Sequence, residues 1–122
     1  MKRDLELVRL ILIRAEAADD FTLRASSFAA DGYDQKTVAR HFQLLEEAGL
    51  IEANLLRTES LGVLQGMLER LTWEGHEFLE ATRNETVWSR TKAIVGEKGG
   101  SASFEVLKAL AMEVSLGYFG LK

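Results

Sequence analysis

The pattern of apolar and polar residues over positions 34–48 has the spacing of an α-helix. Val38, Phe42 and Leu45 follow one another at intervals of four and three residues, which places an apolar stripe on one side. A polar stripe with the same spacing lies opposite: Lys36, Arg40, Gln43 and Glu47. The sequence therefore predicts an amphipathic helix over this segment.

Both ends of this helix carry recognisable boundary residues. Asp34 is a favourable N-cap because its carboxylate can accept hydrogen bonds from the free amides of the first turn. Gly49 fits the left-handed position that commonly ends a helix. The apolar pair Leu50 and Ile51 follows at once, so we expect the helix to lead directly into a strand.

The rest of the chain divides into further helical and extended patterns. Helices are predicted over residues 3–18, 73–83 and 84–95, and from Ser101 or Ser103 to residues 116–119. Strands are predicted at Ile51–Arg57 and Leu68–Thr72, with a glycine-containing loop at 58–66 between them. These two strands would form a hairpin. Trp73 and Trp88 stand beside aliphatic residues at helical spacing, so we expect core positions rather than base-stacking or ligand-binding ones.

Residues Phe21–Ala30 have no clear period and end at the turn signal Asp31-Gly32. A short strand over residues 22–28 is the favoured interpretation. The alternative is a short helix that would serve as the first half of a helix-turn-helix.

The last predicted helix is apolar on more than one face. A terminal helix of this kind often packs across a subunit boundary. We expect a homodimer through this helix, with these residues at the interface: Phe104, Leu107, Leu110 and Val114.

The formal net charge of −4 argues against a protein that coats nucleic acid broadly, but it leaves room for a local basic face. Helix 34–48 offers such a face, since arginine can bind guanine and glutamine can bind adenine in a major groove. Candidate contacts to double-stranded DNA are Lys36, Arg40, His41 and Gln43 on the helix and Arg57 and Arg70 on the hairpin. The alternative is a solvated helix face whose charge Glu46 and Glu47 balance.

Catalytic and metal-binding patterns are weak. The chain has two histidines and no cysteine, so a closed structural zinc site is not expected, and His76 and Glu80 are interpreted as helix-surface residues. No serine lies in a nucleophile elbow, and the glycines at 96–100 lack the ending of a phosphate-binding loop. We expect neither an enzyme nor a cofactor. Charged residues interrupt the apolar N-terminal stretch, so a cytoplasmic protein without a membrane span is predicted.

Two segments resemble winged-helix repressors of bacteria: Arg40–Ile51 looks like the end of a recognition helix, and Leu71–Leu79 like the passage from the wing to the next helix. About residues 1–95 resemble, more closely, a small uncharacterised family common in bacteria and their phages. The features that match this family are Met1–Arg9, Gly32-Tyr33, His41, Glu47–Ile51, Leu71–Leu79, Arg83 and Val87-Trp88. The chain departs from the winged-helix pattern at Phe21–Gly32, where a full positioning helix would normally stand.

We expect a mainly α fold with a small antiparallel sheet, in which residues 1–83 form a winged-helix-like domain and residues 84–122 a helical extension; the resemblance supports this fold over residues 1–95. It also implies a phage or prophage origin. We expect a DNA-binding, regulator-like protein. The alternatives are a protein-interaction module that does not bind DNA and, third, a small-molecule sensor at the dimer interface.

Overall fold

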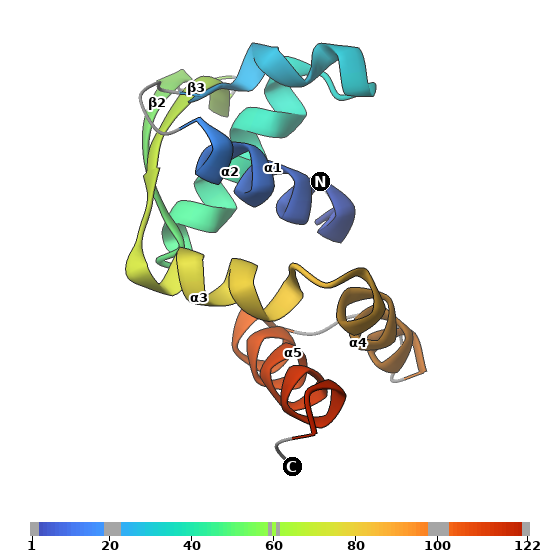
Figure 1. Cartoon of the computed structure of the whole chain (residues 1–122). Helices are drawn as coiled ribbons and strands as arrows, with labels where there is room; N and C mark the ends of the chain where they lie inside the picture. Colours follow the sequence, from blue (N-terminus) through green and yellow to red (C-terminus); the bar gives the residue numbers. More distant parts are fainter. Residues whose placement is uncertain (1–2, 19–22, 59, 61, 98–102, 121–122) are drawn as a thin grey trace. The chain divides into compact units, whose positions relative to one another are not determined.

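The computed structural model describes residues 3–18, 23–58, 60, 62–97 and 103–120. The chain divides into two compact units, Met1–His76 and Glu77–Lys122. Helices predominate, and the strands form one three-stranded antiparallel sheet, which confirms the mainly α fold with a small sheet (Figure 1). The unit boundary falls within a helix, ahead of the domain boundary predicted after residue 83.

The first unit holds the sheet. Its elements in chain order are α1 (Leu5–Ala17), β1 (Leu23–Arg24), the 3-10 helix η1 (Ala25–Asp31), α2 (Gln35–Glu47), β2 (Ile51–Thr58), β3 (Gly62–Leu71) and the first turn of α3 (Trp73–Thr82). The second unit holds the rest of α3 with α4 (Glu85–Glu97) and α5 (Phe104–Tyr118).

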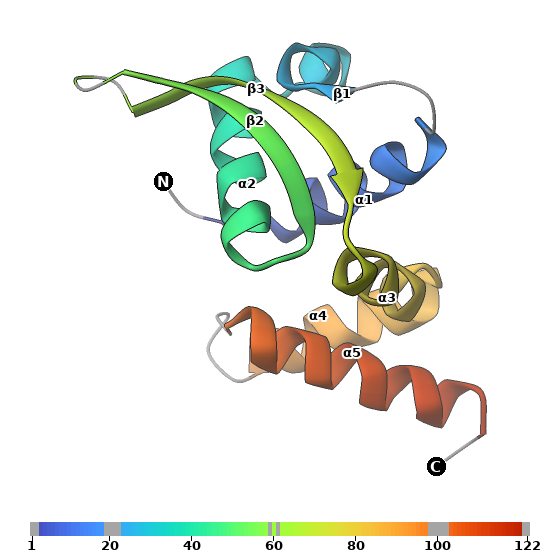
Figure 2. The ribbon, with the colours of Figure 1, turned by 90° about the vertical axis from the view of Figure 1, so that its left-hand side faces the viewer.

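Strand β3 lies at the centre of the sheet, between β1 and β2. Leu68 is the register partner of Leu23 on one side and of Ala53 on the other. In Figure 2 the β2–β3 hairpin crosses in front of α2, which covers one face of the sheet. Val38, Phe42 and Leu45 of α2 are completely buried, which confirms the predicted apolar stripe.

The boundaries of α2 agree with those predicted. The Asp34 carboxylate accepts a hydrogen bond of 2.7 Å from the Thr37 N–H. At the other end Gly49 adopts φ 78°, and the Leu50 N–H donates to the Leu45 carbonyl at 2.9 Å. The left-handed glycine reverses the chain, so β2 starts two residues later and runs back along α2.

The side chain of Glu46 ties α2 to strand β2. Its Oε2 accepts a hydrogen bond of 2.9 Å from the Ala53 N–H. The ladder shifts register between Glu52 and Ala53, so this amide is served by a side chain from the helix.

The favoured strand over residues 22–28 is wrong beyond Arg24. The described strand β1 comprises only Leu23 and Arg24, and residues 25–31 form η1. Ala25 and Phe28 are both buried and stand three residues apart, which is the repeat of a 3-10 helix and not of a strand. Gly32, at φ 90°, ends this turn. The alternative prediction of a short helix therefore fits residues 25–31.

The predicted loop at 58–66 is too long, because β3 begins at Gly62. Gly66 does not make a turn. A Cβ there would lie 2.9 Å from Leu55 Cδ2 and 3.1 Å from Phe42 Cδ2, so the glycine lets α2 and β2 approach β3 closely.

Trp88 is buried as predicted, but Trp73 is 74% exposed, so its predicted core position is wrong. Gly75 is the residue of this turn that faces the sheet, where a Cβ would collide with the Leu50 carbonyl oxygen. Trp73 stands two residues earlier, about 200° around the helix, and is therefore directed away.

The other helices also begin at polar caps. Asp4 accepts hydrogen bonds from the Glu6 and Leu7 amides at the start of α1. Asn84 does the same for Thr86 and Val87 at the start of α4. Ser103 caps α5, whereas Ser101 lies outside the described residues.

Candidate nucleic-acid interface

The polar stripe of α2 remains accessible after the helix has packed. Lys36 is exposed, and Arg40 and Gln43 are half-buried. The stripe is held in place by the Asp34 cap at its start and by the buried stripe on the opposite side. Three of the predicted DNA contacts thus share one ordered face.

Arg40 reaches from this face to the tip of the hairpin. Its Nη2 lies 3.9 Å from the position that a Cβ on Gly62 would occupy. Arg57 lies near the same tip, because its register partner is Val63, the residue after Gly62. Its side chain is exposed. Among the described residues neither arginine forms a salt bridge.

Charges segregate along α2 and β2. Lys36 and Arg40 lie in the first half of α2 and Arg57 near the hairpin tip, while Glu46 and Glu47 end the helix. Among the described residues, Asp34 adds an acidic group at this end. Hydrogen bonds from the side chain and backbone of Thr37 lower its pKa, and Lys36 lowers it further. One end of the first unit is therefore basic, although the whole chain is acidic.

His41 does not belong to this face. The ring is completely buried, and its Nε2 accepts a hydrogen bond of 2.9 Å from the Asp4 N–H. Nδ1 lies 2.9 Å from the Thr37 carbonyl oxygen, to which it donates. The prediction of a DNA contact at His41 is wrong because the side chain links α1 to α2 inside the core.

Arg70 also lies apart from the basic end. Its Nε and Nη2 donate to the Glu52 carboxylate at 3.0 and 2.7 Å, and its Nη1 donates to the Leu71 carbonyl. The carboxylate raises the pKa of Arg70. Arg70 and Glu52 face each other at the base of the hairpin, so Arg70 has a partner that the sequence did not indicate.

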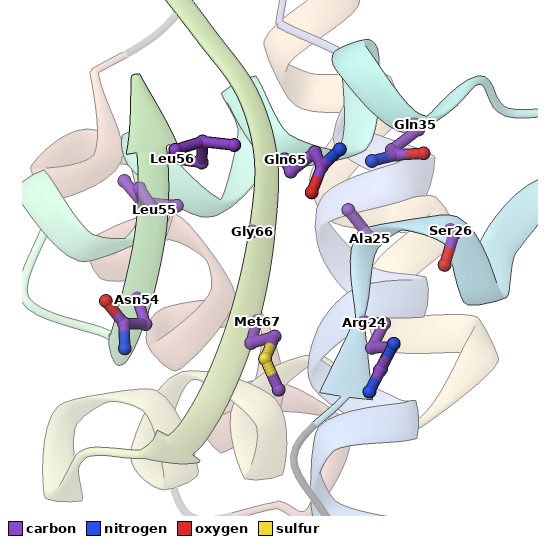
Figure 3. Close-up of a pocket in the computed structure, with 10 residues that line it drawn as sticks. All are labelled: Arg24, Ala25, Ser26, Gln35, Asn54, Leu55, Leu56, Gln65, Gly66 and Met67. Atoms are coloured by element: carbon purple, nitrogen blue, oxygen red, sulfur yellow. The ribbon is translucent and has the colours of Figure 1, made fainter.

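A shallow cavity of about 300 Å³ lies beside the first turn of α2. Its polar lining residues were not predicted and come from four segments: Arg24, Ser26, Gln35, Asn54 and Gln65. Figure 3 shows the side chains of Gln35 and Gln65 directed toward each other across the gap between α2 and β3. No pattern in the sequence indicates this cluster, because its residues are far apart along the chain and come together only in the folded unit.

The predicted dimer residues lie on α5 in the second unit. Leu107 is completely buried, and Leu110 and Val114 are half-buried. The side chain of Phe104 lies outside the described residues. Leu107 therefore serves the interior of its own chain and is not available as an interface residue.

Within the described ranges, no three side chains of metal-binding type come together. His76 is exposed on α3. None of the described helices has both the length and the apolar character that a bilayer crossing requires.

These features define a mainly helical domain with a small sheet, a long hairpin and a basic end. The chain belongs to the family of hypothetical proteins DUF2513, whose family model matches residues 2–101, and the predicted membership of an uncharacterised family is confirmed. An uncharacterised protein of Haemophilus influenzae (strain ATCC 51907 / DSM 11121 / KW20 / Rd) is 36% identical over 114 residues, which cover 93% of this chain and 95% of the relative. No solved structure matches the chain.

Proposed function

We propose that the first unit binds double-stranded DNA through α2 and the tip of the β2–β3 hairpin, as part of a DNA-binding regulator. The observation that carries the proposal is that Arg40 reaches Gly62 near the hairpin tip and Arg57 stands in the strand pair beside it, with no salt bridge to either arginine among the described residues. Lys36 adds a third positive charge on the same side. Exposed cations without acidic partners attract phosphate groups.

The order of elements in the first unit supports a winged-helix mode of binding. A helix, a short strand, a helical turn, α2 and a hairpin follow one another, with η1 in the place of the usual positioning helix. In this mode α2 enters the major groove, where Arg40 can contact guanine and Gln43 adenine. Arg57 would bind the phosphate backbone and fix the orientation of the protein.

The cavity beside α2 extends this surface. Arg24 adds a cation, and the amides of Gln35 and Gln65 add paired donors and acceptors next to Lys36. Amide groups of this kind suit base edges or bridging waters. The phage or prophage origin implied by the resemblance, and a cytoplasmic location, remain predictions beside this proposal.

The proposal can be tested with the variant Arg40→Ala/Arg57→Ala. Fluorescence anisotropy with a labelled mixed-sequence duplex at low salt should give a clear binding curve for the unaltered protein. Removal of both arginines should weaken binding about tenfold or more. The slope of log affinity against log salt should also fall by about one for each arginine that no longer binds a phosphate.

Arg90→Ala provides the matched control, since Arg90 is an exposed arginine on α4 in the second unit. Its affinity and salt dependence should stay close to those of the unaltered protein. Undetectable binding by the unaltered protein at low salt, or an equal weakening in both variants, would refute DNA binding at this surface.

The alternative function is a protein-interaction module without DNA binding. The observation that favours it is the large apolar side chains left exposed on α5 and at its C-terminal cap: Val106, Met112, Leu116, Tyr118 and Phe119. A protein that does not bind the duplex but binds another protein through the exposed residues of α5 would fit this alternative.

A further inference from the structure

Helix α5 has two apolar faces, and one of them packs within the second unit. Leu107 and Ala111 are completely buried, and Leu110 and Val114 are half-buried on the same side. This inner face packs in the second unit, where α5 contacts α4. It includes three of the four residues that the sequence suggested as a dimer interface, and the side chain of the fourth, Phe104, is not described.

The opposite face is apolar and exposed. From Ala109 onward its members are Ala109, Met112 and Leu116 on α5 and Phe119, the residue that caps the end of the helix, and we call this set the α5 seam. The last three are 40%, 41% and 64% exposed. An exposed stripe this apolar on a single helix is unusual for a side that meets only water.

The spacing of the α5 seam is compatible with a second copy of the chain as its partner. Its residues follow one another at intervals of three, four and three, which is the a/d repeat by which two helices pack along each other. Any helix that packs along a surface has this spacing, as α2 has against the sheet, so the charges that flank the seam must distinguish between partners. A second copy of α5 carries the same repeat, so two copies are complementary to each other.

We infer that the protein forms a parallel homodimer in which the α5 seams of two copies pack together. This inference goes beyond DNA binding and does not depend on it, because it concerns α5 alone. The seam covers about two heptads, so the dimer should form and dissociate with concentration rather than be permanent.

The charges beside the α5 seam select the parallel orientation. With Ala109 and Leu116 at a positions, Lys108 takes a g position and Glu113 the following e position. In a parallel pair, each g residue faces the e residue of the next heptad on the partner helix, so Lys108 of each copy meets Glu113 of the partner subunit. In an antiparallel pair, the two lysines face each other and so do the two glutamates, which is repulsive.

Sedimentation velocity on the full chain over a wide range of concentration tests this dimer. The unaltered protein should pass from monomer to dimer, and Met112→Glu/Leu116→Glu should weaken dimerisation about a hundredfold or more. Leu56→Glu is the control, since Leu56 is 54% exposed on β2 in the first unit, and it should change the dimer constant by less than about threefold.

Charge reversal tests the orientation. Lys108→Glu and Glu113→Lys should each weaken the dimer, and the double reversal should restore it. Both residues also make interactions within their own chain, so the unfolding midpoint of each variant is measured alongside. Single reversals that leave the dimer unchanged would refute the parallel arrangement. A monomer at all concentrations, or a dimer insensitive to the seam variant, would refute the interface and leave this face to another protein.

Discussion

His41 joins parts of the first unit that are distant in sequence, since it binds the amide of Asp4, 37 positions away. Because the Asp4 N–H donates to Nε2, the ring proton must sit on Nδ1, where it serves the Thr37 carbonyl. Both ring nitrogens therefore have partners inside the core. His41, which the sequence places at the border of the basic face of α2, thus fixes the position of α1 on α2.

Asp34 gives a prediction at the scale of a single residue. Its pKa is lowered from 3.8 by the hydrogen bonds from Thr37, so its contribution to stability is complete above that value and disappears as the pH falls through the lowered pKa. Asp34→Ala should therefore unfold at a lower temperature than the unaltered protein near neutral pH. Thermal unfolding followed by circular dichroism should show the difference narrowing below about pH 4.

Asp34→Asn is the control for charge, because asparagine keeps a capping oxygen that does not titrate in this range. Its stability relative to the alanine variant should change little with pH. A difference between Asp34→Ala and the unaltered protein that stays constant down to acid pH would contradict the role of the carboxylate.

At the scale of elements, the first turn of α3 is held against the end of α2. The Thr72 N–H donates to the Leu50 carbonyl at 3.0 Å, and the Thr72 hydroxyl donates to the Gly49 carbonyl. The same hydroxyl accepts from the Gly75 N–H at 3.1 Å. Gly75 lies so close to Leu50 that any side chain there would force the two segments apart.

Gly75→Ala should consequently destabilise the first unit by about 2 kcal/mol or more, since the obstructing atom is backbone and cannot rotate away. Chemical denaturation gives the free energy of unfolding directly. Gly96→Ala is the matched control: it also lies in a helix, but a Cβ there meets nothing within 4 Å, so it should be neutral or stabilise by up to about 1 kcal/mol. Similar destabilisation in both variants would show that helix propensity, and not the contact with Leu50, sets the effect.

The elements that the sequence predicts well are those whose ends depend on neighbouring residues. Asp34 begins α2 and Gly49 ends it, and both act on residues of the adjacent turn. Asn84 begins α4 in the same way. Gly66 looks like a loop residue in the sequence, and only the approach of Phe42 from another element explains its place in β3. The two apolar faces of α5 are equally visible in the sequence, but which face is covered depends on α4.

The candidate site divides in the same way. Lys36, Arg40 and Gln43 share a face because of helical spacing, which a sequence displays. The burial of His41, the pairing of Arg70 with Glu52 and the approach of Arg40 to the hairpin tip all involve residues far apart along the chain. Such contacts follow from the folded arrangement of α1, α2 and the hairpin.

At the scale of the whole molecule, charge and apolar surface are concentrated in different units. The first unit has a basic end formed by Lys36, Arg40 and Arg57, and the second carries the exposed seam of α5. The net charge of −4 is a sum over the whole chain and does not describe the local charge at the basic end. Phosphate at the hairpin tip would experience the local charges more strongly than distant ones, because salt screens charges beyond about 10 Å.

This separation predicts that local charge matters more than net charge. Glu47→Gln, at the end of the α2 stripe, should strengthen duplex binding about two- to fivefold at about 0.1 M salt by removing nearby repulsion. Glu97→Gln makes the same change in net charge on an exposed residue of the second unit and should have little effect. Equal strengthening by both variants in anisotropy titrations would mean that the overall charge governs binding.

The hydrogen bond from Ala53 to Glu46 has a consequence for strand pairing between copies of this chain. Strand β2 is an edge of the sheet, and an edge amide without a partner favours strand addition and aggregation. The Glu46 carboxylate accepts the hydrogen bond of the Ala53 amide. The register shift beside this amide interrupts the regular edge along which an incoming strand would pair. The negative charge of Glu46 beside the open edge thus disfavours the addition of a strand from another copy to β2. Association of copies through other surfaces is not affected.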